Sequence, residues 1–125
     1  MHLDHLILAV NDLDSSVRFY TEVLGMQNEG MTGPFTVMRL DDDCTIQLAP
    51  WGTDGGQHLA LAMDLDEFNR AWGRIRSAGL PFGDSFHQAD NMCGPGVEDG
   101  ARGPGAAIYL LDPNDHLIEI RHYEQ

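Results

Sequence analysis

Two histidines, a glutamine and a glutamate occupy matching places in the two halves of this 125-residue sequence. His5 opens the apolar run "HLILAV", and His58 opens "HLALAM". Gln47 and Glu119 lie in the segments "TIQLA" and "LIEIR", which close the two halves. Imidazole nitrogens together with carboxylate and amide oxygens suit a borderline divalent metal that keeps positions open for water or substrate. The four residues are therefore candidate metal ligands.

Each of these residues also has a simpler interpretation. An inward-facing histidine such as His5 is more often a hydrogen-bonded core residue. A buried carboxylate needs compensation, so Glu119 could form a structural ion pair with Arg121 or Arg39. The repeat favours the metal site, because core packing does not require a histidine at the start and an amide or carboxylate at the end of both halves. The other histidines lack this placement and are expected to face solvent or form local hydrogen bonds: His2, His87, His116 and His122.

The elements that must position these residues repeat as well. Each histidine begins an apolar strand, which leads through an Asp-rich turn into an amphipathic helix. The first helix is expected to be capped by Asp14 or Ser15 and to end at Gly25. The second helix has the same signals, namely a capping box and a terminal glycine, at Asp64, Glu67 and Gly79.

Strand pairs are predicted after each helix. They read "FTVMRL" and "CTIQLAP" in the first half, and "AAIYLL" and "HLIEIRHY" in the second. The segment 83–105 between the second helix and its strands is rich in Gly and Asp, so it is expected to be a mobile loop over a site or a passive insertion. The pattern predicts one α+β domain spanning 1–125, with module one at 1–52 and module two at 56–125.

The composition indicates which classes of binding partner to expect. The formal charge is −13, with 20 acidic residues against 7 arginines and no lysine. Such a surface repels nucleic acid and anionic lipid, which leaves a small molecule as the expected partner. Cys44 and Cys93 have no CxxC spacing and are expected to be free thiols. No apolar run is long enough for a membrane helix, and the N-terminus lacks a signal-peptide pattern, so a cytoplasmic protein is expected.

The segments "LDHLILAVNDLDSSVRFYTEVLGM" and "IYLLDPNDHLIEIRHYE" resemble the vicinal oxygen chelate superfamily. That superfamily includes glyoxalase I, fosfomycin resistance proteins, extradiol dioxygenases and bleomycin-binding proteins. The resemblance implies a glyoxalase-like fold of two βαβββ modules, each curving a mixed sheet around a cup, and a homodimer that exchanges modules.

The resemblance also implies a ligand set. His5, His58 and Glu119 fall at the metal-ligand positions, and Gln47 falls at the position of a fourth ligand in glyoxalases. In small members His5 and Gln47 would come from one chain and the other two ligands from its partner, so that a dimer would hold two shared sites. Each site would take one divalent ion, with Mn, Fe, Co, Ni or Zn as candidates.

Within this superfamily a glyoxalase-like isomerase or lyase is the favoured activity. Its substrate would be a small molecule with vicinal oxygens, converted through a metal-stabilised enediolate. Glu119 or a metal-bound water would be the base, and Tyr109 is a second catalytic candidate that could equally be a packed strand residue. Glyoxalase I normally has a carboxylate where this chain has Gln47. The candidates for binding an anionic substrate group, which are more ordinary as ion-pairing residues, are Arg39, Arg102 and Arg121.

Three alternatives stay open. Fosfomycin resistance proteins share the His, His, Glu set, but this chain stops soon after Glu119 and lacks their basic C-terminal extension. An extradiol dioxygenase would match at Tyr109 and Glu119, but Asp115 occupies a glycine position and the histidine expected before Ile108 is missing. A non-catalytic bleomycin-type binding protein would suit the acidic surface, although such proteins do not keep the metal ligands.

Overall fold

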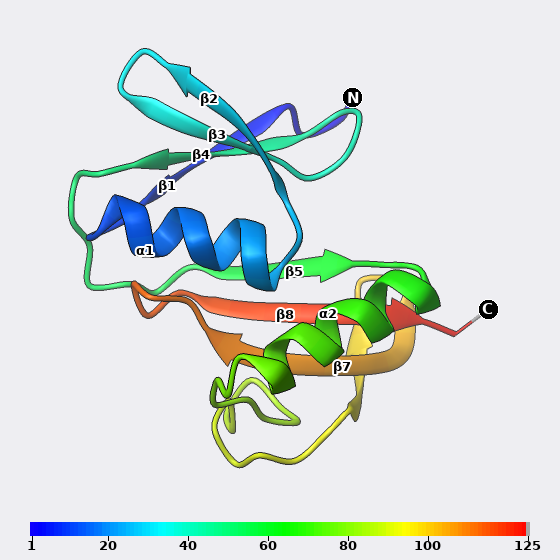
Figure 1. Cartoon of the computed structure of the whole chain (residues 1–125). Coiled ribbons are helices and arrows are strands. Elements are labelled where there is room, and N and C mark those ends of the chain that lie inside the picture. The colour runs from blue at the N-terminus through cyan, green and yellow to red at the C-terminus, as the bar shows by residue number, and fades with distance from the viewer. Residues whose placement is uncertain (125) are drawn as a thin grey trace.

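The computed structural model describes residues 1–124 and divides them into two modules of the same design (Figure 1). Module one contains β1 (His5–Ala9), α1 (Leu13–Arg18) with its π-helical extension η1 (Phe19–Val23), β2 (Gln27–Thr32), β3 (Phe35–Arg39) and β4 (Thr45–Ala49). Module two contains β5 (His58–Ala62), α2 (Leu65–Ser77), β6 (Gly96–Gly100), β7 (Gly103–Leu111) and β8 (Leu117–Tyr123).

The two sheets have identical topology. Their strand orders are β1-β4-β3-β2 and β5-β8-β7-β6. In each sheet the first strand runs parallel to the last strand of its module, and the other neighbours are antiparallel. The expected α+β fold of two βαβββ modules with mixed sheets is therefore confirmed.

The helix boundaries follow local capping. Asp12, rather than the expected Asp14 or Ser15, caps α1, because its extended backbone lets the carboxylate accept a hydrogen bond from the backbone N–H of Asp14. Asp64 caps α2 as expected, accepting from the N–H of Glu67 at 2.8 Å. The terminal glycines have the left-handed backbone that suits a helix end, with φ of +81° at Gly25 and +69° at Gly79.

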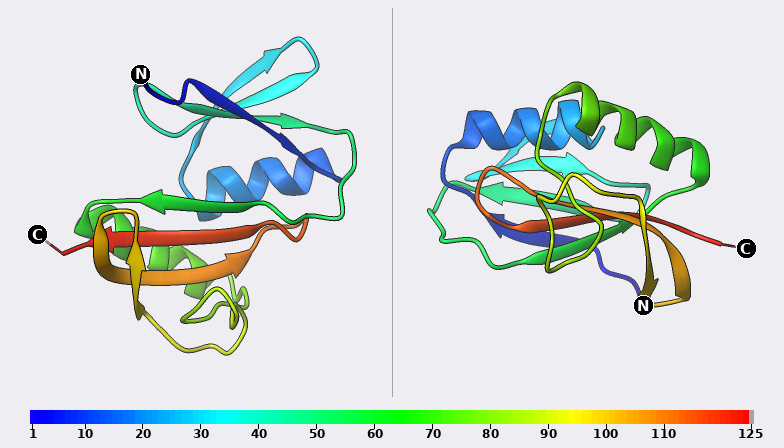
Figure 2. Two further views of the ribbon diagram at one scale, coloured as in Figure 1. Left: turned by 180° about the vertical axis from the view of Figure 1, so that it is seen from behind. Right: turned by 90° about the horizontal axis from the view of Figure 1, so that it is seen from below.

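One apolar core joins the helix-covered faces of both sheets. Figure 2 shows both helices on the same side of the molecule, over the strands. Strand alternation sends Leu8 on β1 and both Ile118 and Ile120 on β8 into this core. The residues between them, including the candidate ligands, therefore lie on the opposite faces of the sheets.

Two strands of the structure, β2 and β6, have no strand pattern in the sequence. The segment 83–105, expected to be a loop, contains β6, which pairs with the start of β7 from Gly96–Ala107 to Gly100–Gly103. Its sequence "GVEDG" has no apolar alternation, because β6 is an edge strand. β2 is exposed along its whole length and lacks a pattern for the same reason.

A buried polar cluster fastens module two to module one. The carboxylate of Asp112 accepts hydrogen bonds from the Tyr20 hydroxyl at 2.6 Å and from the backbone N–H groups of Asn114 and His116. His116 was expected to face solvent or bond locally, but it is 2% exposed. Its Nε2 lies 2.8 Å from the Ala9 carbonyl of module one, and its Nδ1 lies 3.2 Å from the N–H of Gln57. Within the described part of the chain, no helix is long and apolar enough to span a membrane.

Candidate metal centre

Glu119 lies at the centre of the helix-free face of module two. In the sheet register it is flanked by Ala60 of β5 and Tyr109 of β7. Because paired residues share a face, Tyr109 stands beside the carboxylate, and His58 reaches it diagonally from the start of β5. Three elements that are distant in sequence thus place His58, Tyr109 and Glu119 together.

The Glu119 carboxylate is shared between two cationic or potentially cationic groups. Its Oε1 lies 2.9 Å from Nε2 of His58, and its Oε2 accepts a hydrogen bond from Nη1 of Arg121 at 2.5 Å. The Glu119 side chain is 7% exposed, whereas that of His58 is 45% exposed. The ion pair with Arg121 that the sequence offered as one interpretation is therefore present, and His58 lies on the other side of the same carboxylate.

Arg121 is held under β6. Its Nη2 donates to the Glu98 carbonyl of β6 at 2.8 Å, and its guanidinium carbon stacks 4.5 Å from the centre of the Tyr123 ring. The side chain is 2% exposed. Strand β6, which has no pattern in the sequence, therefore covers Arg121, and Glu98 is a site residue that no motif indicated.

Tyr109 keeps its proton more tightly than an ordinary tyrosine. Burial, followed by the negative charge of Glu119, raises the pKa of Tyr109 to about 12. Its ring centre lies 6.3 Å from that of His58. At neutral pH the hydroxyl is therefore protonated and can donate a hydrogen bond or a proton on this face.

Module one presents a matching but separate pair. Gln47 of β4 is flanked by Ile7 and Val37, just as Glu119 is flanked by Ala60 and Tyr109. His5 is exposed, and its Nδ1 lies 2.7 Å from the carboxylate of Asp4. A carboxylate on one ring nitrogen commonly orients a ligating histidine and leaves the other nitrogen for the metal.

The two pairs do not meet within one chain. Across residues 1–124, no three His, Cys, Asp or Glu side chains come close enough to hold a metal ion together. The 2.9 Å contact between His58 and Glu119 is a hydrogen bond or ion pair in this structure, and its imidazole and carboxylate are groups that divalent ions also bind. The structure therefore keeps two candidate half-sites apart, His58–Glu119 and His5–Gln47.

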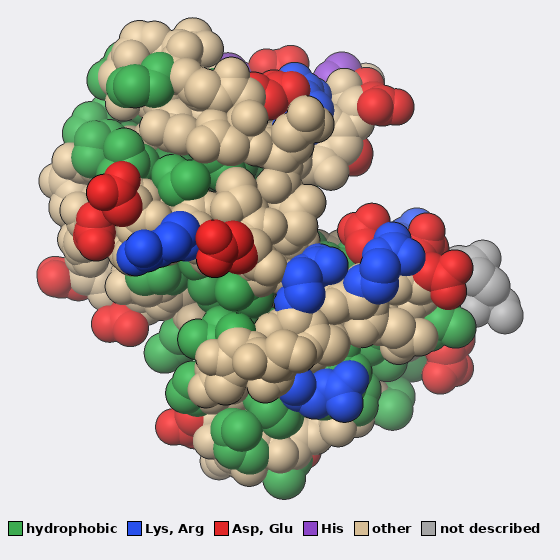
Figure 3. Space-filling view, viewed as in Figure 1, with side chains coloured by type: hydrophobic (Ala, Val, Ile, Leu, Met, Phe, Trp, Pro, Cys, Tyr) green, Lys and Arg blue, Asp and Glu red, His purple; other side chains and the backbone are tan. Residues whose placement is uncertain are grey.

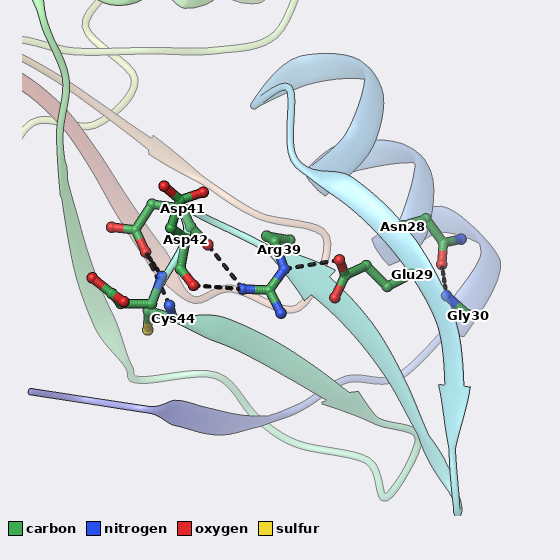
Figure 4. Close-up of polar contacts among 8 residues, drawn as sticks. Asn28, Glu29, Gly30, Arg39, Asp41, Asp42 and Cys44 are labelled. Atoms are coloured by element: carbon green, nitrogen blue, oxygen red, sulfur yellow. Dashed lines mark hydrogen bonds and ion pairs between the residues drawn. The ribbon is translucent and has the colours of Figure 1, made fainter.

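The other predicted arginines have partners of their own. Arg39 donates from Nε to Glu29 at 2.8 Å and from Nη1 to the carbonyls of Asp41 and Asp42 at 2.9 and 3.3 Å (Figure 4). The bond to Glu29 is the main cause that raises the pKa of Arg39. Arg102 stacks over the Tyr123 ring at 4.3 Å. Neither arginine contacts the His58–Glu119 pair.

A groove runs between the two modules, where Figure 3 shows the surface hollowed beside exposed arginines. It is lined by the end of the first helix and its exit, the β3–β4 turn, β5 and the first turns of α2, with Arg70 and Arg74 on the α2 side. None of the residues predicted for the metal centre or the substrate lines this groove.

Comparisons with known proteins agree on a family. The profile of the Glyoxalase/Bleomycin resistance protein/Dioxygenase superfamily matches residues 2–120. "Glutathione transferase FosA" of Serratia marcescens is 27% identical over 94% of this chain and 78% of its own length. "Probable lactoylglutathione lyase" of Vibrio parahaemolyticus is 27% identical over 97% of this chain and 90% of its own. The solved structure of "Oxidase ChaP-H1" superposes with a TM-score of 0.83 at 27% identity, covering 99% and 97% of the two chains.

Proposed function

We propose that this chain, which belongs to the Glyoxalase/Bleomycin resistance protein/Dioxygenase superfamily, is a divalent-metal-dependent isomerase or lyase of the glyoxalase type. Its substrate would be a small molecule with vicinal oxygens. The observation that carries the proposal is the His58–Glu119 pair. Its Nε2 and Oε1 atoms lie 2.9 Å apart, on a face that also presents the Tyr109 hydroxyl. The lyase relative from Vibrio supports the same reaction class.

The complete centre would be shared between two chains. His58 and Glu119 of one chain would be joined by His5 and Gln47 of a second copy, in a homodimer with two such sites. Two observations support this arrangement: the half-sites occupy equivalent positions in the two sheets, and they do not converge in a single chain. The ion would be Mn, Fe, Co, Ni or Zn, because imidazole and oxygen ligands suit all five.

The chain's own residues would divide the chemistry. The metal, when bound, would act as a Lewis acid on the two substrate oxygens. Glu119 would accept the proton that leaves the carbon next to the carbonyl group, with Arg121 bound beside it. Tyr109, protonated at neutral pH, would donate a hydrogen bond to a substrate oxygen on the same face. Gln47, a neutral amide, would serve as a ligand only.

Oxygenation is the second candidate. Tyr109 lies directly opposite Glu119, and the structurally similar ChaP-H1 is called an oxidase. Thiol addition to a phosphonate, the chemistry of fosfomycin resistance enzymes, has less support. A dianionic group would need several free cations, but of the three candidate arginines Arg39 is bound to Glu29 and Arg121 to Glu119, which leaves Arg102.

Turnover by reconstituted protein tests the proposal. Protein stripped with a chelator would be loaded in turn with each of the five metals. It would then be assayed with a hemithioacetal of glutathione, with a catechol in air, and with fosfomycin plus thiol. Metal-dependent turnover of the hemithioacetal is expected, lost in Glu119→Gln and kept in Arg76→Met on the outer side of α2. Consumption of the catechol alone would favour the oxygenase, and turnover without any metal would contradict the proposal.

A further inference from the structure

We propose that Arg121 is the positioning residue of this centre. It holds one oxygen of Glu119, so that only the other oxygen is presented to His58 and the metal. This inference deepens the proposed function and rests on it. It assigns Glu119 as a ligand through a single oxygen, Oε1, and makes the orientation of that oxygen depend on a residue that does not touch the metal.

The contacts of the guanidinium divide its donors between two acceptors. An arginine frequently binds a carboxylate through two parallel hydrogen bonds, one to each oxygen. Arg121 instead gives Nη1 to Oε2 of Glu119 and Nη2 to the Glu98 carbonyl. Its Nε is the one buried side-chain nitrogen or oxygen without a partner among the described residues. An arginine that only neutralised Glu119 would be free to take both oxygens. The bond to Glu98 fixes an orientation that reaches only Oε2 and leaves Oε1 for His58.

A comparison with the equivalent position in module one supports a link between Arg121 and the Glu119 carboxylate. In the register of the parallel strands, Arg121 is paired with Ala62, just as Ala49 is paired with Ala9 in module one. Ala49 follows the neutral Gln47 by two residues, and Arg121 follows the charged Glu119 by two. The half-site with a neutral amide thus has no arginine at this position, and the half-site with a carboxylate has one.

Gly100 of β6 leaves the space that the Arg121 guanidinium occupies. A methyl group on Gly100 would overlap the guanidinium of Arg121 and the hydroxyl of Tyr123. The Gly100 backbone lies outside the positive-φ region, so alanine is conformationally allowed there. Glycine at this position therefore serves close packing, and Gly100→Ala should displace Arg121 without changing any charge.

Cobalt binding tests the inference in the metal-stripped protein. Co²⁺ would be titrated into wild type, Arg121→Met and Gly100→Ala, with affinity and visible absorption recorded. Loss of a residue that orients a ligand typically weakens metal affinity 10–100-fold, so a drop of about that size is expected in both variants. The d–d spectrum should also change, because Glu119 is then free to rotate and bind through both oxygens.

Two controls match these variants. Arg102→Met removes the other arginine that stacks on Tyr123 but does not contact Glu119, and Gly73→Ala adds a methyl group where no atom lies within 4 Å. Both should bind Co²⁺ as wild type does. A merely structural role for Arg121 would lower the fraction of folded protein but leave the spectrum of bound Co²⁺ unchanged.

The outcomes separate the two proposals. Wild-type affinity and spectrum in Arg121→Met would overturn the positioning role while leaving the metal centre intact. If Arg121→Met does not fold, Gly100→Ala decides in the same way. Failure of the wild type itself to bind Co²⁺ or any of the other four metals would overturn the proposed function, and the positioning role with it.

Discussion

At the scale of single residues, Glu119 shows how burial decides the effect of a charge. Its carboxylate is almost fully buried and lies against the equally buried guanidinium of Arg121, whereas His58 on its other side is nearly half exposed. Removing one partner of a buried ion pair leaves the other charge without compensation, whereas an exposed partner is replaced by water. The two neighbours of Glu119 should therefore differ in what their loss does to stability.

We expect Glu119→Gln to lower the free energy of unfolding by about 3 kcal/mol, because it leaves the Arg121 charge buried without a counter-ion. His58→Ala should lower it by less than about 1 kcal/mol. Urea denaturation of the metal-free proteins at neutral pH measures both values. Equal losses in the two variants would mean that the Arg121–Glu119 pair is not buried as described.

The candidate ligands could be proposed from the sequence because each half begins with a histidine and ends with a glutamine or glutamate. Such a repeat can be recognised without knowledge of the structure. What the sequence could not supply was their environment. Glu98 contributes a backbone carbonyl, which any residue type could offer. In the sequence, Arg121 fits both a substrate-binding role and an ion-pairing role. The contact between Arg121 and Glu98 depends on β6 folding over β8, which no local pattern encodes.

At the scale of elements, the strongly amphipathic segments were predictable and the edge strands were not. The helix with its cap at Asp64 and its end at Gly79 follows the expected signals. β2 and β6 lie at sheet edges, so neither the alternation of a half-buried strand nor the continuous apolar run of a buried one appears in their sequences. The cap of α1 lies at Asp12, two or three residues before the expected Asp14 or Ser15, because "DLDSS" offers several acceptable capping side chains within one turn.

Helix α2 allows a matched pair of glycine substitutions. Gly73 lies inside the helix with no atom within 4 Å of an added methyl group, and Gly79 ends it with φ of +69°. Gly73→Ala should raise the free energy of unfolding by about 0.5–1 kcal/mol, because alanine loses less backbone entropy on folding. Gly79→Ala should lower it, since alanine is strained at that φ. Thermal unfolding monitored by circular dichroism measures both shifts, and a stabilised Gly79→Ala would contradict the assigned helix end.

At the scale of the whole molecule, the two modules are joined by the core and by the Asp112 cluster. The bond from Tyr20 to Asp112 connects the first helical segment to the β7–β8 turn. Burial, followed by the charge of Asp112, raises the pKa of Tyr20 well above its ordinary value of 10.0. The folded protein thus holds this proton more tightly than the unfolded chain, so its contribution to stability is complete below pH 10 and is lost as the pH rises further.

Tyr20→Phe should therefore have two effects. At neutral pH it should lower the free energy of unfolding by about 2 kcal/mol, because Asp112 loses one donor in a buried site. Above pH 10 the stability of the variant should fall less steeply than that of wild type. Urea denaturation at a series of pH values from neutral to alkaline provides the comparison. Parallel curves across this range would show that Tyr20 ionises as readily in the folded protein as in the unfolded chain.

Mixing of subunits would show whether one metal centre is built from residues of two chains. His5→Ala and His58→Ala would each be purified without metal, then unfolded together and refolded in equal amounts with Co²⁺. If sites are shared, every mixed dimer carries one site with both histidines, so the mixture should recover about a quarter of the wild-type Co²⁺ content while each variant alone recovers almost none. Co²⁺ content in the mixture no higher than in the separate variants, beside a fully loaded wild type, would contradict a centre shared between chains.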